Sequence, residues 1–524
     1  MAAEKLTRSA GVLTPLFSVY SRSSIGTGEI PDIRLLVDWC RKAGLSLIQL
    51  LPMNDAGFNF RPYDSESSMA LEPFYLSIDE IAHVDTDEFK SEIAALRKKY
   101  PCEGDYFDTS VKKAKLDLLW YMYRRKKKSG DKDFAIYAEQ NRPWLEPYAQ
   151  YKVLKDRFGL SGWMSWPEDL KNRNPDALAA LEKDEHETLV FYQWLQWQLY
   201  LQFSEAKKYA RKNGVRIVGD IPFLVSRDSA DVWARPSYFK LHLSSGAPPD
   251  MYFAAGQEWG MPPADWEEIE RHDYDYLTQK LKYAENFYDL FRIDHFVGVF
   301  RVWTFQRGLP DAERAKTAAF DPPDESVWEE HGRKIVEAML RSTSMRPCAE
   351  DLGCVPKCSD RVLEDYGIPG MEVQRWMRHW ETTGEYKRPE EYRENAIAVI
   401  STHDTSPLEA WWKWEAGSDD DRQKFWAAAG LTGKFDAEPT QELIDACFDL
   451  VSRSRSVFSI QLIQDWFSYG GLFKDIRKDY RINMPGIVHD KNWRLRLPLS
   501  LEQMLKSPLH RKIAALNRST RRIG

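Results

Sequence analysis

The chain has 524 residues, of which 73 are basic and 80 are acidic, so its formal net charge is −7. This balance leaves no basic footprint for nucleic acid or for an anionic membrane, and no apolar run is long enough to cross a bilayer. The amino-terminal residues lack the apolar core of a signal peptide, and six cysteines in so long a chain do not indicate a disulfide framework. We therefore expect a cytoplasmic globular protein that binds neither nucleic acid nor membrane.

The chain opens with a strand–helix–strand pattern. Two short apolar runs, at residues 11–19 and 45–52, are typical of buried strands. Between them, Ile33, Leu36 and Cys40 fall on one face of a helix. Because a helix that joins two strands favours parallel pairing, this opening predicts an α/β fold.

A long helical stretch follows. Apolar residues recur at intervals of three and four, for example at Trp194, Trp197 and Leu201. The residues expected to break the helices in this stretch are Pro143, Pro147 and Gly159. We therefore expect a mainly helical insertion after the second strand, which divides the chain into a first part of a barrel (1–85), the insertion (86–210) and the remainder of the barrel with loop insertions (211–524).

Strands and helices then alternate to the carboxyl terminus. The further candidate strands are residues 216–225, 290–295, 346–351, 371–376, 396–403 and 457–464. With the first two, they make eight. Eight parallel strands with intervening helices close most simply into a (β/α)8 barrel, whose active site lies at the carboxyl ends of the strands.

Three acidic residues stand at the ends of these runs: Asp294, Glu350 and Asp404. Such a set suits acetal chemistry on sugars. Arg292 lies two residues before Asp294, so both side chains point the same way, and an arginine favours the ionised carboxylate that a nucleophile needs. Asp220 lies within the third strand run. Taken singly, the three acidic residues would also fit a buried ion pair, a helix cap and a loop aspartate.

Each of the two later acidic residues has its own expected role. Glu350 stands near other acidic groups and is partly desolvated, which predicts a raised pKa and a general acid/base. Asp404, after His403, is placed to hold sugar hydroxyls and to favour a distorted, positively charged ring. Aromatic residues in loops marked by glycine or proline, Tyr63 and Trp259, suit stacking on sugar rings. Cys354 and Cys358 have no second metal-spaced pair, so we expect no zinc site.

An ordered set of motifs resembles glycoside hydrolase family 77, the 4-α-glucanotransferases known as amylomaltases or disproportionating enzymes. The motifs are Pro-Tyr at 62–63, Gly-Asp-Ile-Pro-Phe-Leu-Val and Asp-Ser-Ala-Asp-Val-Trp-Ala within 219–234, Pro-Pro-Asp at 248–250, Gly-Gln-Glu-Trp-Gly at 256–260, Phe-Arg-Ile-Asp-His-Phe-Val-Gly at 291–298, Glu-Asp-Leu-Gly at 350–353, Ser-Thr-His-Asp-Thr-Ser-Pro at 401–407, and Asn-Met-Pro-Gly with Asn-Trp-Arg within 483–494. The resemblance runs nearly end to end and implies a (β/α)8 barrel.

The resemblance also implies roles. Asp294 matches the nucleophile, Glu350 the general acid/base and Asp404 the stabiliser of the transition state. The positions that match substrate contacts are Tyr63, Asp220, Gln257, Trp259, Arg292 and His403. The implied reaction transfers part of a maltooligosaccharide or another α-1,4-glucan to the 4-hydroxyl of a second glucan or glucose, with retention and without cofactor or metal. The alternatives are an α-amylase-like hydrolase and a catalytically silent glucan-binding protein.

The chain departs from the usual family pattern in loops expected to bind substrate. Met261 stands where an asparagine is common, and Met251 stands where a tyrosine usually comes first. The loop 246–262 is rich in glycine, proline and aromatic residues, and we expect it to form a lid on the acceptor side. These departures concern the choice of acceptor and chain length rather than the class of reaction.

Overall fold

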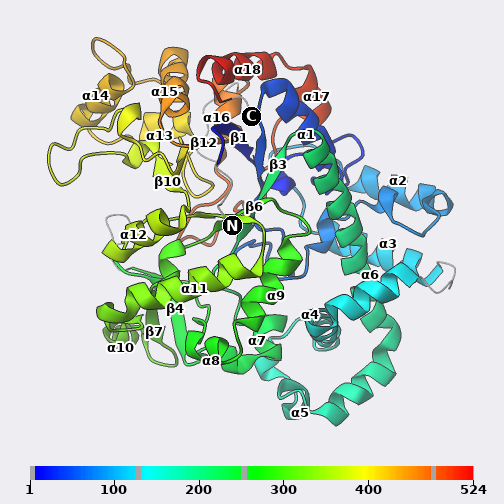
Figure 1. Cartoon of the computed structure of the whole chain (residues 1–524). Coiled ribbons are helices and arrows are strands. Elements are labelled where there is room, and N and C mark those ends of the chain that lie inside the picture. The colour runs from blue at the N-terminus through cyan, green and yellow to red at the C-terminus, as the bar shows by residue number, and fades with distance from the viewer. Residues whose placement is uncertain (1–5, 126–131, 250–255, 474–479, 523–524) are drawn as a thin grey trace.

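The computed structural model describes residues 6–125, 132–249, 256–473 and 480–522. Its centre is a sheet of eight parallel strands in the order β10-β11-β12-β1-β2-β3-β6-β9, with helices around it (Figure 1). The two ends of this order meet, because the amide of Ala349 at the end of β9 donates a hydrogen bond of 2.7 Å to the carbonyl of Pro369 just before β10. The predicted (β/α)8 barrel is therefore confirmed.

All eight barrel strands fall in or at the edge of the predicted runs. Their bounds are β1 (Ser9–Leu13), β2 (Leu47–Gln49), β3 (Arg216–Ile221), β6 (Leu290–Ile293), β9 (Arg346–Ala349), β10 (Gly370–Val373), β11 (Ala396–Val399) and β12 (Phe458–Leu462). The strands are shorter than the apolar runs that predicted them, since the runs continue into buried turns. Residues 16–18, for example, form a buried 3₁₀ turn after β1.

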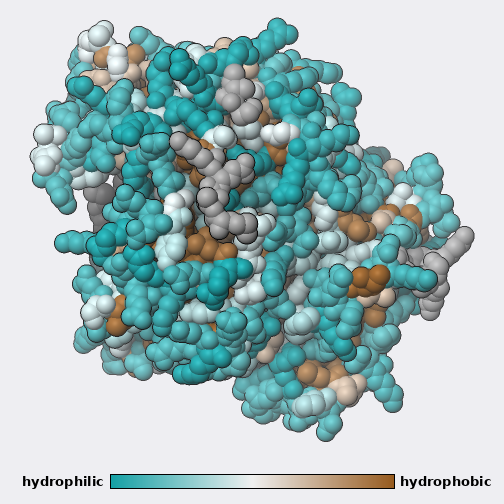
Figure 2. All heavy atoms as spheres, viewed as in Figure 1, coloured by the Kyte–Doolittle hydropathy of each residue, from teal (hydrophilic) through white to brown (hydrophobic). Residues whose placement is uncertain are grey.

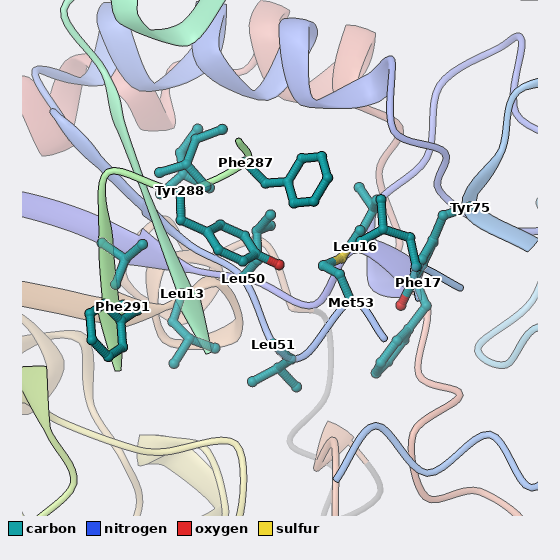
Figure 3. Close-up of a cluster of buried hydrophobic side chains, with 14 of the residues drawn as sticks. Leu13, Leu16, Phe17, Leu50, Leu51, Met53, Tyr75, Phe287, Tyr288 and Phe291 are labelled. Carbon is teal, nitrogen blue, oxygen red and sulfur yellow. The ribbon is translucent and has the colours of Figure 1, made fainter. Parts of the chain in front are cut away.

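Apolar side chains of successive β/α units pack together near the barrel. Figure 3 shows Leu13, Leu50, Tyr288 and Phe291 in one such cluster, and each of them is at most 5% exposed. Gly219 allows the Tyr288 ring to approach β3, because a Cβ at this position would lie 2.4 Å from a ring carbon of Tyr288. This close packing fixes β3 beside β6, where two of the predicted site residues lie.

Helices cover the outside of the barrel. Those that follow its strands are α1 (Asp32–Ala43), α7 (Ala230–Ala234), α8 (Trp266–Arg271), α9 (Asp275–Ala284), α10 (Asp311–Arg314), α11 (Trp328–Ser342), α12 (Lys357–Tyr366), α13 (Leu408–Trp414), α14 (Asp419–Ala428), α15 (Gln441–Arg453), α16 (Ile463–Tyr469), α17 (Leu501–Lys506) and α18 (Leu509–Ser519). Between β10 and β11 the chain instead forms 3₁₀ turns at Gln374–Trp376 and Pro389–Glu391. The alternation of strand and α-helix is thus broken at one connection.

Helices also fill the segment between β2 and β3, as expected. They are α2 (Lys90–Lys99), α3 (Val111–Arg125), α4 (Lys132–Arg157), α5 (Glu168–Lys171) and α6 (Pro175–Lys212), and Figure 1 shows them on the side of the barrel away from α13, α14 and α15. Because α6 also packs against α1 and β3, it belongs to the barrel wall as well as to the insertion. The division at residues 85/86 and 210/211 stays a prediction.

The expectation that Pro143 and Pro147 break the helices is wrong. Both prolines lie inside the continuous helix α4. An interior proline removes one hydrogen bond and crowds the preceding turn. Here the helix is held by tertiary packing, because one side of it, including Tyr148 and Tyr151, is buried. Gly159, by contrast, does follow the end of α4 and has a positive φ of 60°.

A second sheet lies outside the barrel and has no counterpart among the predicted strands. Its order is β5-β4-β7-β8, formed by β5 (Gln257–Glu258), β4 (Leu243–Ala247), β7 (Val302–Gln306) and β8 (Ala319–Asp321), and all its pairs are antiparallel. The sheet joins the segment after β3 to the segment after β6. It therefore carries Gln257 next to the carboxyl ends of two barrel strands.

Among the described residues, no helix combines the length and the apolar character needed to cross a membrane. On the face of the molecule seen in Figure 2, hydrophilic residues predominate, and the hydrophobic ones form small, scattered groups.

Candidate active site

Arg292 lies at the centre of the charged site at the carboxyl ends of β3, β6 and β9. Its Nη1 atom lies 2.8 and 2.9 Å from the two carboxylate oxygens of Asp220 and 2.9 Å from Oδ1 of Asp294. Its Nη2 atom lies 3.6 Å from Oε2 of Glu350. One guanidinium group thus contacts three carboxyl groups from three neighbouring strands. The structure therefore brings Asp294 and Glu350 together, although they are 56 residues apart.

The charge of Arg292 is stabilised by these neighbours. Burial alone would lower the pKa of Arg292, but the neighbouring carboxylates, Asp220 above all and then Asp294, raise it well above its ordinary value. Asp220 is only 2% exposed, and its burial raises its pKa, while Arg292 opposes this shift. Because Asp220 accepts hydrogen bonds from Arg292 and from the hydroxyl of Tyr63, it is anchored within the site.

Glu350 follows β9 and is held by the backbone of the neighbouring strand end. The amide of His295 donates a hydrogen bond of 2.8 Å to its Oε2 atom. Burial, opposed by the charge of Arg292 and assisted by the nearby Asp294, raises the pKa of Glu350 to about 8. The pKa is thus raised, as the sequence led us to expect. The carboxyl group of Glu350 carries its proton at neutral pH and can act as an acid.

His295 presents this amide from an unusual backbone conformation. Its φ is +45°, in the left-handed region that residues other than glycine rarely adopt. The turn is held on both sides, since the amide of Phe296 donates to the carbonyl of Glu350 and the amide of Glu350 donates to the carbonyl of Ile293, both at 3.0 Å. Strain of this kind persists where surrounding contacts fix it, and here it directs one amide at the Glu350 carboxyl group.

Asp404 follows β11 and is strongly favoured as a carboxylate. The Nε2 atom of His403 lies 3.2 Å from its Oδ2 atom, and Nδ2 of Asn483 donates to its Oδ1 atom at 2.7 Å. Burial alone would raise the pKa of Asp404, but His403 and Asn483 lower it to about 2. The side chain of Asp404 is still 43% exposed. It is therefore an ionised group that a ligand can reach.

Tyr63 connects the Arg292 cluster to Asp404. Its hydroxyl donates a hydrogen bond of 2.7 Å to Oδ2 of Asp220. Its ring stacks on the ring of His403, with centroids 5.2 Å apart and planes inclined by 11°. Tyr63 lies on the loop after β2 and thus contacts both Asp220 of β3 and His403 after β11. Asp294, Glu350 and Asp404 consequently belong to one connected site.

Gln257 and Trp259 approach the site from the second sheet. The Trp259 ring meets the ring of His295 edge to face, with centroids 5.0 Å apart. Its indole nitrogen lies 3.4 Å from Oε1 of Gln257. The backbone of Trp259 is fixed by a hydrogen bond from its amide to the carbonyl of Ser245 in β4. Trp259 thus lies next to the turn that holds Glu350, and Gln257 lies beside Trp259.

The departures in the loop 246–262 are only partly described. Met261 lies beside β4, and its carbonyl accepts a hydrogen bond of 2.7 Å from the amide of Ser245. Met251 falls in 250–255, outside the described residues. The proposed lid is therefore described at both ends only.

Two residues near Asp404 were not among the predicted site residues. Asn483 bonds its carboxylate, as described above. Trp493 adds a ring beside Tyr63 and His403, at centroid distances of 5.7 and 5.9 Å. Both stand in the Asn-Met-Pro-Gly and Asn-Trp-Arg motifs, so the sequence contained the signal. It did not show that a segment about 80 residues after Asp404 folds back onto it.

Buried lysines from the helical insertion anchor the loop that carries Tyr63. Lys112 of α3 lies 2.9 Å from Asp55 Oδ1 and 2.7 Å from Glu72 Oε1, and it is 1% exposed. Lys152 of α4 lies 3.0 Å from Asp55 Oδ2 and 2.6 Å from Glu66 Oε2. The three acidic residues lie on both sides of Tyr63 in the chain. The insertion therefore fixes the loop from which Tyr63 reaches the site.

The site combines a carboxyl group with a raised pKa, Glu350, with Asp294, which contacts the cation Arg292, and with Asp404, whose pKa is lowered. This combination suits proton transfer and nucleophilic attack at a saccharide carbon. Within the described residues, no group of three or more His, Cys, Asp and Glu side chains is arranged to hold a metal ion. Cys354 and Cys358 are free thiols in the structure.

Comparison with known proteins identifies the family. Residues 14–501 match the family model of glycoside hydrolase family 77, described as 4-alpha-glucanotransferase. The chain is 33% identical to a 4-alpha-glucanotransferase of Chlamydia pneumoniae over 96% of this chain and 93% of that protein. It is 34% identical to the corresponding protein of Chlamydia caviae over 94% of this chain and 92% of that protein.

Solved structures show the same fold. An amylomaltase from Streptococcus agalactiae in complex with acarbose superposes with a TM-score of 0.81 at 21% identity, covering 99% of this chain and all of that one. An amylomaltase from Corynebacterium glutamicum also gives a TM-score of 0.81 at 21% identity, over 97% of this chain and 75% of that one. With the family model spanning nearly the whole chain, the protein belongs to the 4-α-glucanotransferases of glycoside hydrolase family 77.

Proposed function

We propose that this 4-α-glucanotransferase acts on maltooligosaccharides and other α-1,4-glucans by a retaining double displacement, with Asp294 as nucleophile, Glu350 as general acid/base and Asp404 as transition-state stabiliser. The observation that carries the proposal is the single guanidinium group of Arg292, which contacts both Asp294 and Glu350. This shared contact supports the proposal, because it brings the two carboxyl groups beside one another. In a retaining enzyme, the carboxyl groups of the nucleophile and of the general acid/base are roughly 5–5.5 Å apart.

In the first step, Asp294 attacks the anomeric carbon of the donor glucan. The bond from that carbon to the O4 atom of the leaving glucan breaks, and Glu350 gives its proton to this oxygen. The pKa of about 8 at Glu350 supports this role, because the group holds its proton until the leaving oxygen needs it. The products are a covalent glucanosyl–Asp294 ester and a shortened glucan.

In the second step, the 4-hydroxyl of an acceptor glucan or glucose attacks the same carbon. Glu350, now ionised, takes the proton of this hydroxyl, and the bond to Asp294 breaks. Two inversions restore the α configuration. Transfer in place of hydrolysis requires that water is excluded while the ester waits.

The remaining predicted residues are proposed to hold the sugar. Asp404, ionised and 43% exposed, suits hydrogen bonds to hydroxyl groups of the ring that carries the developing charge. His403 and Tyr63 would flank the same ring, while Gln257 and Trp259 would contact it from the second sheet. The complex of the Streptococcus agalactiae amylomaltase with acarbose supports a saccharide bound to this fold. Asp220 and Arg292 would orient the nucleophile.

Incubation with maltotriose tests the function. We expect glucose together with a ladder of longer chains, and no net increase in reducing ends, because every bond broken is replaced by one formed. Products are separated by chromatography, and reducing ends are titrated in the same samples. A steady rise in reducing ends would instead indicate an α-amylase-like hydrolase. Binding of maltodextrin with no turnover would indicate a silent glucan-binding protein.

A further inference from the structure

A short hairpin follows β10. Arg378 and Tyr386 form an antiparallel bridge, and the amide of His379 donates to the carbonyl of Glu385 at 2.9 Å. The chain reverses at Gly384, which has a positive φ of 68° and donates to the carbonyl of His379 at 3.0 Å. This segment, residues 378–386, is referred to below as the β10 hairpin. It takes the place of the α-helix that a barrel connection usually contains.

The β10 hairpin carries an exposed but fixed tryptophan, Trp380. The residue is 54% exposed, while its indole nitrogen donates a hydrogen bond of 3.0 Å to the carbonyl of Trp376. The guanidinium carbon of Arg378 lies 4.7 Å from the centre of its ring. Arg378 is itself held by Asp421 of α14, at 2.8 Å, and by the carbonyl of Gly384, at 2.7 Å. The ring is therefore packed against Arg378, while more than half of the surface of Trp380 remains exposed to solvent.

The position of the β10 hairpin relates it to the active site. In the barrel, β10 pairs with β11 and lies next to β9. Glu350 directly follows β9, and Asp404 lies five residues after the end of β11. The hairpin therefore leaves the barrel at its carboxyl face, between the strands that lead to these two carboxyl groups. A chain of sugars that extends from the site between them would leave the barrel on the side that carries the hairpin.

The surroundings of Trp380 fit a sugar better than a protein partner. A stable protein interface buries on the order of 1,000 Å² or more with an apolar centre. Around Trp380 the exposed neighbours are instead polar, including Glu381, Thr382 and Glu385. A single aromatic face within a rim of hydrogen-bonding groups matches a glucose ring, which has apolar C–H faces and hydroxyl groups at its edge.

We propose that Trp380 is a stacking platform that binds a glucose unit of a long α-1,4-glucan at a subsite remote from the bond that is cleaved. The proposal rests on the α-1,4-glucan as substrate. Because the ring is already fixed by Trp376 and Arg378, little side-chain freedom is lost when the sugar binds. Long chains gain this contact, and chains too short to reach Trp380 do not. The platform thus gives the enzyme a preference for longer glucans.

Three variants test the platform. Trp380→Leu removes the aromatic face and keeps an apolar side chain, whereas Trp380→Phe keeps a smaller aromatic face. Tyr121→Leu is the matched control, since Tyr121 on α3 is also exposed and stacks on an arginine, Arg125, at 4.6 Å. The kcat/KM values are measured with maltotriose and with maltoheptaose, and their ratio reports the preference for length.

We expect Trp380→Leu to lower the ratio of kcat/KM for maltoheptaose over that for maltotriose about tenfold, mainly through KM, since one stacked sugar contact is lost. Trp380→Phe should recover much of the ratio, and Tyr121→Leu should leave it at the wild-type value. An unchanged ratio in Trp380→Leu would overturn the platform. The platform would also be overturned if Trp380→Leu kept the wild-type ratio and only bound granular starch less well. Trp380 would then bind a glucan chain other than the one that is cleaved.

The result also separates this proposal from the proposed function. If the wild-type protein transfers glucosyl units from maltotriose but Trp380→Leu keeps its preference for maltoheptaose, the platform fails and the function stands. If the wild-type protein acts on neither oligosaccharide, the proposed function fails first.

Discussion

The ring of Tyr63 lies flat on the ring of His403, with centroids 5.2 Å apart and planes inclined by only 11°. The two residues lie 340 positions apart in the chain and come from the loops after β2 and β11. Through this contact, and through the hydrogen bond from Tyr63 to Asp220, the part of the site around Arg292 is joined to Asp404. The stacking pair therefore holds the proposed nucleophile and the proposed stabiliser in one arrangement.

Substitution of Tyr63 should separate its two contacts. Tyr63→Phe removes the hydrogen bond to Asp220 and keeps the stacking on His403, so we expect kcat/KM to fall about tenfold, from the loss of one hydrogen bond to a buried charged group. Tyr63→Ala removes both contacts and should lower kcat/KM further. Steady-state kinetics with maltotriose measure both. Equal losses in the two variants would show that the stacking has no role.

Asp294→Asn should abolish transfer. The amide cannot form the covalent ester, and we expect kcat to fall by about 10³-fold or more, while the hydrogen bond with Arg292 can be kept through the amide oxygen. Circular dichroism and the thermal midpoint should remain close to those of the wild type. A variant that is folded and retains near-native turnover of maltotriose would refute the nucleophile assignment.

The activity should depend on the protonation of Glu350. The first step needs the protonated form, which is present below the pKa of about 8 and is lost as the pH rises through it. Asp404 has a pKa of about 2 and stays ionised over the same range. We therefore expect kcat/KM for maltotriose to fall above a pH of about 8. A constant kcat/KM up to pH 10, measured where the enzyme is still folded, would contradict the role of Glu350 as acid.

The stability of the loop that carries Tyr63 should depend on Lys112. This lysine is 1% exposed and pairs with the buried Asp55 and Glu72. Lys112→Met leaves both carboxylates without this partner, which we expect to cost about 3–5 kcal/mol. The matched control is Lys113→Met on the same helix, where the lysine is 71% exposed and the expected cost is at most about 0.5 kcal/mol.

Differential scanning calorimetry compares the two lysine variants with the wild type. The midpoint of Lys112→Met should lie well below that of Lys113→Met. Equal midpoints would mean that the buried ion pairs do not hold the insertion to the barrel. Because Tyr63 lies between the anchored residues, we also expect Lys112→Met to have a lower kcat/KM than the wild type at temperatures at which the variant is still folded.

The barrel and its chemistry could be predicted from the sequence because their signals are local. Short apolar runs mark buried strands wherever the chain later places them, and all eight runs became barrel strands. An acidic residue directly after such a run is carried to the carboxyl end of its strand, as with Asp294 and Glu350. The helical spacing around Trp194 and Trp197 likewise predicted α6. In each case the pattern lies within a few residues.

Other features depend on residues that are distant in the chain. The antiparallel sheet was missed because its strands are short and pair segments up to some 60 residues apart. Pro143 and Pro147 lie inside a helix because packing outweighs the local cost of a proline. Asn483 reaches Asp404 only because the chain returns to the barrel mouth after β12.

The sequence by itself determined which residue types stand at the strand ends and in what order, since periodicity and spacing are properties of neighbouring residues. Only the tertiary structure decided that one guanidinium group is shared by Asp220, Asp294 and Glu350, and that Tyr63 stacks on His403. Burial beside Asp294 raises the pKa of Glu350, and His403 and Asn483 lower that of Asp404. These contacts arise when the barrel closes, because closure brings charges from separate strands into one poorly solvated volume, where each strongly affects the others.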